Sequence, residues 1–139
     1  MATSQRKQAH VLFTDIVGYS RLPTDRQAER IGVLNGIVRG APEVAERLGT
    51  NRLLSLPTGD GMALAFFDDP AAPLECARVV ARALRQQPDL PVRMGLHTGV
   101  VVDVADLNAN VNIAGGGINL AQRVMDCGDA GHILVSQTV

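Results

Sequence analysis

Aromatic side chains are scarce in this sequence: they make up 3% of the residues, and tryptophan is absent. A protein that stacks single-stranded bases needs several aromatic side chains on one surface. Basic residues form no run, and 13 of them stand against 14 acidic residues, which gives a net charge of −1. No nucleic-acid partner is therefore expected, because such a surface carries clustered Lys and Arg.

Long apolar runs are also missing. No apolar stretch approaches the length that spans a membrane. The N-terminal segment, MATSQRKQAH, is polar and has none of the apolar core of a signal peptide. We therefore expect a cytoplasmic protein with no membrane partner.

Only two cysteines are present, Cys76 and Cys127, and neither has the CxxC or histidine spacing that is typical of a metal site. Both fall in segments that we expect to be helical. We therefore expect both thiols to be buried, reduced and structural.

Apolar residues form 46% of the 139-residue chain, which is enough for one folded domain over residues 1–139. Apolar patterns predict strands at 11–16, 53–56, 62–67, 92–97, 100–104 and 132–136, with a turn at Gly99. Apolar stripes predict helices at 24–48, 69–85 and 118–126, the first kinked at Pro42. Residues 106–117 are expected to form a polar connection.

The order of these elements defines the expected fold. We expect an α/β (α+β) fold with a ferredoxin-like βαββαβ core, followed by an additional C-terminal hairpin strand, a helix and a strand. In such a core the first and third strands are antiparallel neighbours. The end of the first strand therefore lies beside the start of the third.

Two aspartates occupy those positions. Asp15 ends the first strand in FTDIVGYS, and Asp60 precedes the third in LPTGDGMALAFF. Taken singly, Asp15 is also compatible with a turn that bonds its own backbone, and Asp60 with a hairpin Asp-Gly. Together at one sheet edge they predict a site for Mg²⁺ or Mn²⁺. Two such ions about 4 Å apart activate a hydroxyl and stabilise a leaving phosphate.

Other polar groups are compatible with phosphate chemistry but are less specific. The backbone from Ile16 to Tyr19 precedes a helix, where N–H groups can hold phosphate oxygens or simply form a turn. Asn119 and Arg123 lie one helical turn apart, which also suits a solvated pair. Arg93, on the polar side of its strand, favours a surface salt bridge when it is considered alone.

Four segments in order resemble the catalytic domain of class III nucleotide cyclases, and they cover most of the chain. They are FTDIVGYS, LPTGDGMALAFF, VRMGLHTGVV and NIAGGGINLAQRVMDCGDAGHILVS. That family converts a nucleoside triphosphate to a 3′,5′-cyclic nucleotide and pyrophosphate. Its domains pair head to tail, so the resemblance implies a homodimer with shared active sites.

The resemblance also implies a role for each site residue. Asp15, Asp60 and the Ile16 backbone would hold two Mg²⁺ or Mn²⁺ ions per active site. The triphosphate would bind to Val17, Gly18, Tyr19 and Arg93. Asn119 would orient the ribose, and Arg123 would reach the α-phosphate from the second protomer.

Two departures from the family leave the base open. Leu56 stands where adenylyl cyclases usually carry a base-reading lysine, and Asn112 stands at the partner position, usually Asp or Thr. ATP, GTP and a pyrimidine triphosphate all stay candidates. The chain also ends before the usual C-terminal strands and their triphosphate-binding lysine.

Two other classes of protein compete with an active cyclase. One is a cyclase-homology domain that no longer turns over and serves as a nucleotide-binding or regulatory module, which Leu56 and the early end favour. The other is a polymerase-palm or GGDEF-type domain, although no GGDEF string is present. The four residues Asp15, Asp60, Asn119 and Arg123 favour a catalytic cyclase.

Overall fold

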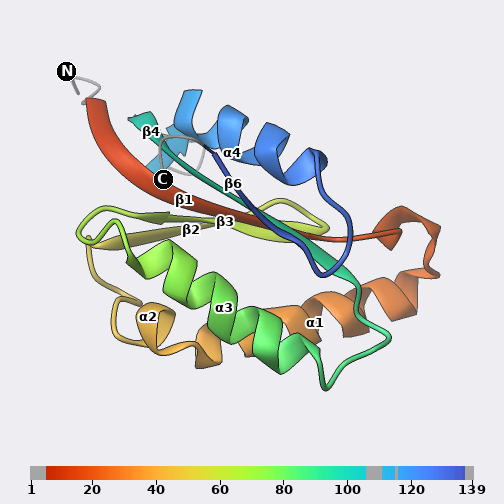
Figure 1. Cartoon of the computed structure of the whole chain (residues 1–139). Coiled ribbons are helices and arrows are strands. Elements are labelled where there is room, and N and C mark those ends of the chain that lie inside the picture. The colour runs from red at the N-terminus through yellow and green to blue at the C-terminus, as the bar shows by residue number, and fades with distance from the viewer. Residues whose placement is uncertain (1–5, 106–110, 115, 137–139) are drawn as a thin grey trace.

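A computed structural model describes residues 6–105, 111–114 and 116–136. A mixed sheet separates helices on its two faces (Figure 1). The strands are β1 (Arg6–Ile16), β2 (Leu53–Pro57), β3 (Gly61–Phe66), β4 (Val92–Ala105), β5 (Val111–Ala114) and β6 (Ile133–Val135). The helices are α1 (Thr24–Gly40), α2 (Pro42–Ala45), α3 (Ala72–Leu84) and α4 (Gly116–Asp126), with a 3₁₀ turn η1 at Tyr19–Arg21.

The strand order is β2-β3-β1-β4-β5, and all four of these pairings are antiparallel. β1 is therefore central, with β3 on one side and β4 on the other. β6 pairs parallel with the first half of β4, through Met94–Leu96, whereas β5 pairs with its second half. This arrangement confirms the expected ferredoxin-like core with a further strand, helix and strand after it.

Alternate residues of β1 serve two separate cores. Leu12 and Ile16 pack into the larger apolar cluster, which joins the sheet to α1, α2 and α3. Ala9, Val11 and Phe13 face the other way, into a smaller cluster that is covered by α4. Figure 1 shows α4 alone on its side of the sheet. The middle of β1, Val11–Phe13, is buried on both faces and is apolar, as such a position requires.

The expected turn at Gly99 is wrong. β4 continues through it as one strand of 14 residues, and Gly99 pairs with Ala9 inside the ladder with β1. The strand that turns back is β5, which lies in the segment expected to be a polar connection. Apolar residues on both sides of Gly99 are explained by a long strand as well as by a hairpin.

Two helices and one cysteine also differ from the expectation. The first helix ends at Gly40, because Ala41 is extended (φ −67°, ψ 129°), as residues before proline prefer. α3 begins at Ala72 rather than Asp69, whose carboxylate accepts a hydrogen bond from the Ala71 N–H at 2.9 Å. Cys76 is buried as expected, but Cys127 follows α4 and is exposed.

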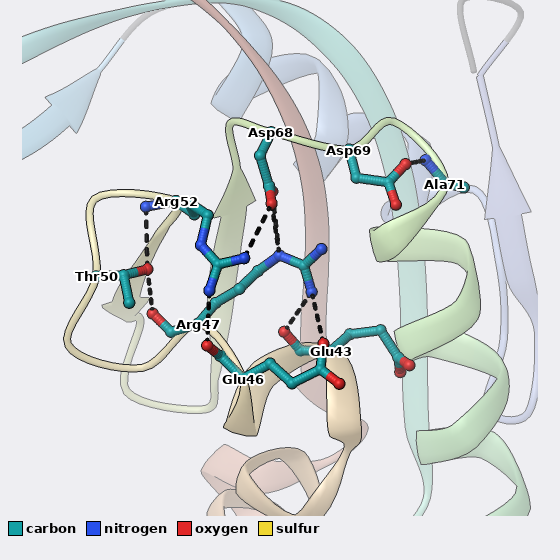
Figure 2. A network of polar contacts seen from close by, with 8 residues as sticks. All are labelled: Glu43, Glu46, Arg47, Thr50, Arg52, Asp68, Asp69 and Ala71. Atoms are coloured by element: carbon teal, nitrogen blue, oxygen red, sulfur yellow. Dashed lines mark hydrogen bonds and ion pairs between the residues drawn. The ribbon is translucent and has the colours of Figure 1, made fainter.

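A buried arginine ties α2 to the segment after β3 (Figure 2). Arg47 is 7% exposed, and its Nε donates to both oxygens of Asp68, at 3.0 and 3.2 Å. Its Nη1 donates to the Glu43 carbonyl at 2.9 Å, and the guanidinium lies over the Phe66 ring. The hydrogen bond from Arg47 lowers the pKa of Asp68. A buried charge of this kind depends on its partner.

We predict that Asp68→Asn lowers the free energy of unfolding by about 2–3 kcal/mol at pH 7, because Arg47 loses its charged acceptor. The pKa of Asp68 in the folded protein lies below its unfolded value of about 3.9. The Arg47–Asp68 pair therefore stabilises the folded state at neutral pH, and this contribution is lost as the pH falls through the folded pKa. Urea unfolding at pH 7 and pH 3 measures the loss of stability and its dependence on pH. The exposed pair of Glu29 with Arg26 provides the control, since Glu29→Gln should cost less than about 0.5 kcal/mol. If the free energies of unfolding of wild type and Asp68→Asn differ by the same amount at pH 7 and pH 3, the assignment of a stabilising Arg47–Asp68 ion pair is contradicted.

Candidate metal and nucleotide site

The fold brings Asp15 and Asp60 together at one end of the sheet. Asp15 pairs with Gly61 across the β1–β3 ladder, so Asp60 is next to that pair in the turn before β3. The Ile16 N–H donates to the Asp60 carbonyl at 2.8 Å, which extends the ladder by one bond. The expected convergence of the two aspartates is thus present.

Gly61 has a steric reason for its place in this turn. A Cβ atom there would overlap the Thr14 carbonyl oxygen and the Asp15 Cα. β1 and β3 therefore leave no room for a side chain at Gly61, next to the place where the two aspartates meet. Gly59, with φ +89°, supplies the left-handed residue that the turn needs.

Asp15 is buried, with 9% of its side chain exposed, and is fully engaged by Arg93. Arg93 is opposite Asp15 in the β1–β4 ladder. Its Nε donates to Oδ1 at 2.8 Å and its Nη2 to Oδ2 at 3.2 Å. This hydrogen bonding is the largest cause that raises the pKa of Arg93, and the charge of Asp60 also contributes. Arg93 therefore makes a salt bridge, as expected, but not at the surface, because its partner is the buried aspartate that is expected to bind metal.

Arg93 has a second acidic partner that the sequence analysis missed. Its Nη2 is 3.2 Å from Oδ1 of Asp126, the last residue of α4. No local motif marks Asp126, because its role depends on where α4 packs on the sheet. The sequence offers one hint: Asp126 lies three residues after Arg123, so the two share a face of the expected helix.

The backbone after β1 offers fewer free donors than expected. The Ile16 N–H bonds to Asp60, and the Val17 N–H donates to the Pro91 carbonyl at 2.9 Å. Within the described part of the chain, no acceptor is found for the N–H groups of Gly18 and Tyr19. Gly18 has φ 75°, which turns the chain into η1. Phosphate binding at this turn would therefore rely on Gly18 and Tyr19.

α4 carries both of the expected catalytic residues. It packs on the sheet through Ala121 and Met125, which are buried. Arg123 is exposed, and no carboxylate among the described side chains pairs with it. The position of Asn119 in α4 is described, but its side chain lies outside the described residues.

Leu56 and Asn112, the expected base-reading positions, are not brought together. Leu56 is in β2 and packs at the edge of the smaller core, whereas Asn112 is in β5. β3, β1 and β4 lie between their two strands. The side chain of Asn112 lies outside the described residues, so the base is not defined by this geometry.

The donor set suits Mg²⁺ or Mn²⁺ bound together with a phosphate. The described residues contain no group of three or more His, Cys, Asp or Glu side chains placed to hold a metal. Mg²⁺, however, is usually bound through one or two carboxylates, with substrate phosphates as further ligands. Asp15 and Asp60 provide that pair, provided that Arg93 yields an oxygen of Asp15.

Two cavities lie in the described part of the chain, and neither is lined by Asp15 or Asp60. One, of about 320 Å³, lies between α1 and the β2–β3 hairpin. The other, of about 370 Å³, lies between the end of α3 and the start of β4.

No helix in the described ranges is long and apolar enough to cross a membrane.

Comparison with known proteins gives a fold but no sequence family. No family model matches the chain, and no curated protein sequence matches it. Among solved structures, a monomeric guanylyl cyclase domain of the RhoGC fusion protein from Blastocladiella emersonii matches with a TM-score of 0.76 and 20% identity, over 99% of this chain and 85% of that one. The guanylate cyclase domain of RhGC from Catenaria anguillulae, in complex with GTP, has a TM-score of 0.75 and 22% identity, over 99% and 81%.

An adenylate/guanylate cyclase/hydrolase from Silicibacter pomeroyi matches at 27% identity, with a TM-score of 0.69, over 97% of this chain and 78% of that one. These neighbours are all adenylyl or guanylyl cyclase domains. The chain therefore has the fold of class III nucleotide cyclase catalytic domains.

We predict that Gly95→Ala shifts α4 and lowers the free energy of unfolding by about 1–3 kcal/mol. A Cβ at Gly95, in β4, would overlap the Met125 backbone, which cannot move without the helix. Gly36→Ala is the matched control, because nothing lies within 4 Å of a Cβ at that α1 position. The control should be neutral or stabilising by up to about 1 kcal/mol. Urea unfolding measures both, and equal effects would argue against close packing of α4 on β4.

Proposed function

We propose that this chain is a nucleotide cyclase that depends on Mg²⁺ or Mn²⁺ and makes a 3′,5′-cyclic nucleotide and pyrophosphate. The observation that carries the proposal is the meeting of Asp15 and Asp60 at the β1–β3 end, beside Arg93, on a cyclase fold. In the reaction the ribose 3′-oxygen attacks the α-phosphorus, loses its proton, and displaces pyrophosphate.

Each residue has a role in this proposal. Asp15 and Asp60, with the Ile16 carbonyl, would hold two divalent ions, which supply positive charge at the 3′-hydroxyl and at the triphosphate. Gly18, Tyr19 and Arg93 would bind triphosphate oxygens, with Val17 shaping the turn. Asn119 would orient the ribose, and Arg123 would stabilise the charge that develops at the α-phosphate.

The site is proposed to be completed by a second copy of the chain. Arg123 is exposed and has no acidic partner in the described chain, so its charge is available to another protomer. A homodimer is therefore part of the proposal, and we propose a cytoplasmic location for it, as the sequence leads us to expect.

The base is left open between ATP, GTP and a pyrimidine triphosphate. Leu56 is apolar and partly buried. An apolar wall discriminates weakly, whereas a site that hydrogen-bonds its base discriminates strongly. A second candidate function rests on this same residue: a cyclase-like module that binds nucleotide without converting it.

We predict that the purified chain with Mn²⁺ converts at least one of ATP, GTP, CTP and UTP to its cyclic monophosphate. Asp60→Ala should lower kcat by about 100-fold or more, because it removes charge that is needed in the transition state. Asp60 is preferred to Asp15, whose loss would strip the partly buried Arg93 of its partner. Glu29→Ala, which removes an exposed carboxylate from α1, is the control and should stay active. Mass spectrometry identifies the product. Nucleotide binding without any cyclic product would support the non-catalytic module instead.

We also predict that two inactive variants restore activity when they are mixed. Asp60→Ala and Arg123→Ala damage different elements, so a mixed dimer contains one intact site if each site takes residues from both protomers. Up to about half of the mixed dimers' sites should then work. Labelled protomers verify subunit exchange by energy transfer. Exchange without recovered activity would place Arg123 and Asp60 in the same site of one protomer.

A further inference from the structure

Arg93 lies between carboxylates from two different elements. On one side it holds both oxygens of Asp15 in β1, and on the other its Nη2 is 3.2 Å from Asp126 in α4. We propose that Arg93 is a positioning residue that competes with a divalent cation for Asp15, and that Asp126 retains the guanidinium when the cation binds. The inference rests on the metal site of the proposed function.

Competition follows from how the Asp15 carboxylate is occupied. Nε and Nη2 bind its two oxygens at 2.8 and 3.2 Å, in the paired geometry that makes Arg–carboxylate contacts strong. A cation on the same carboxylate would lie within a few ångströms of the guanidinium, and the two positive charges repel. Since only 9% of the Asp15 side chain is exposed, solvent screens this repulsion poorly.

The local charge balance favours the exchange. The charges of Asp15, Asp126 and Asp60 all act on Arg93. Three carboxylates against one guanidinium leave a net charge of −2, which one divalent cation neutralises. Arg93 does not have to leave this cluster when a cation arrives, because Asp126 is already in contact with it.

The retained contact has a consequence for α4. The C-terminal end of this helix touches β4 at Gly95, where Met125 packs directly on the backbone, and Asp126 binds Arg93 two residues earlier in β4. A guanidinium released from Asp15 pairs more fully with Asp126. Cation binding at Asp15 would therefore strengthen the attachment of the helix that carries Asn119 and Arg123.

The test measures Mn²⁺ binding to the whole chain without nucleotide, by calorimetry and by the electron paramagnetic resonance of free Mn²⁺. Arg93→Gln should bind Mn²⁺ about tenfold more tightly than wild type, and Asp126→Asn about fivefold more weakly, within the range of ordinary coupling between sites. Asp129→Asn is the matched control: it removes one exposed carboxylate just beyond α4 and should change binding by less than about twofold.

A double variant separates retention of Arg93 from simple loss of negative charge. If Asp126 acts through Arg93, Asp126→Asn should have little effect in the Arg93→Gln background, because coupled residues are not additive. An equal weakening in both backgrounds would show that Asp126 acts only as a nearby charge. Unchanged or weaker Mn²⁺ binding by Arg93→Gln would overturn the inference.

Nuclear magnetic resonance provides a direct readout of the guanidinium. The Arg93 Nε–H signal, assigned by its loss in Arg93→Gln, should shift as Mg²⁺ is added, and a signal that does not move would contradict displacement. If Arg93→Gln tightens Mn²⁺ binding but the wild-type chain forms no cyclic nucleotide, the cyclase proposal fails and this inference stands. If cyclic nucleotide forms without tighter binding, this inference alone fails.

Discussion

The antiparallel pairing of β1 with β3 and β4 is the constraint on which the candidate site depends. One register places Asp15 opposite Gly61 on one side and opposite Arg93 on the other. A slip of one residue would reverse the faces of β1 and move Asp15 away from both. The burial of alternate β1 residues in two separate cores fixes this register, because a slip would exchange the two apolar sets.

Charge at the end of this ladder gives the site its chemistry. A partly buried guanidinium neutralises a buried carboxylate, which makes the pair stable without any ligand. In the proposed complex, a divalent cation would bind to the negative carboxylate of Asp15. The triphosphate would bind to the positive guanidinium of Arg93. The same residues therefore suit two arrangements, and α4 takes part in both through Asp126.

The sequence was sufficient for the parts of the site that depend on strand order alone. A βαββαβ pattern implies that β1 and β3 are neighbours, so the meeting of Asp15 and Asp60 was predictable. Arg93 was recognised as a salt-bridging residue, but its partner depends on the β1–β4 register. Asp126 was missed because its contact requires α4 to pack at Gly95. Gly99 was misread as a turn, since glycine is tolerated inside a central ladder where it pairs with Ala9.

A crystal structure of the chain with Mn²⁺ and a non-cleavable triphosphate analogue would test the proposed site most directly. Anomalous scattering at the manganese edge locates the ions without reference to activity. Two peaks about 4 Å apart between Asp15 and Asp60 are expected, with Arg93 withdrawn from Asp15 toward Asp126 and the phosphates. Manganese bound elsewhere, with the Arg93–Asp15 contacts intact, would contradict the assignment of these aspartates as the metal site of a cyclase.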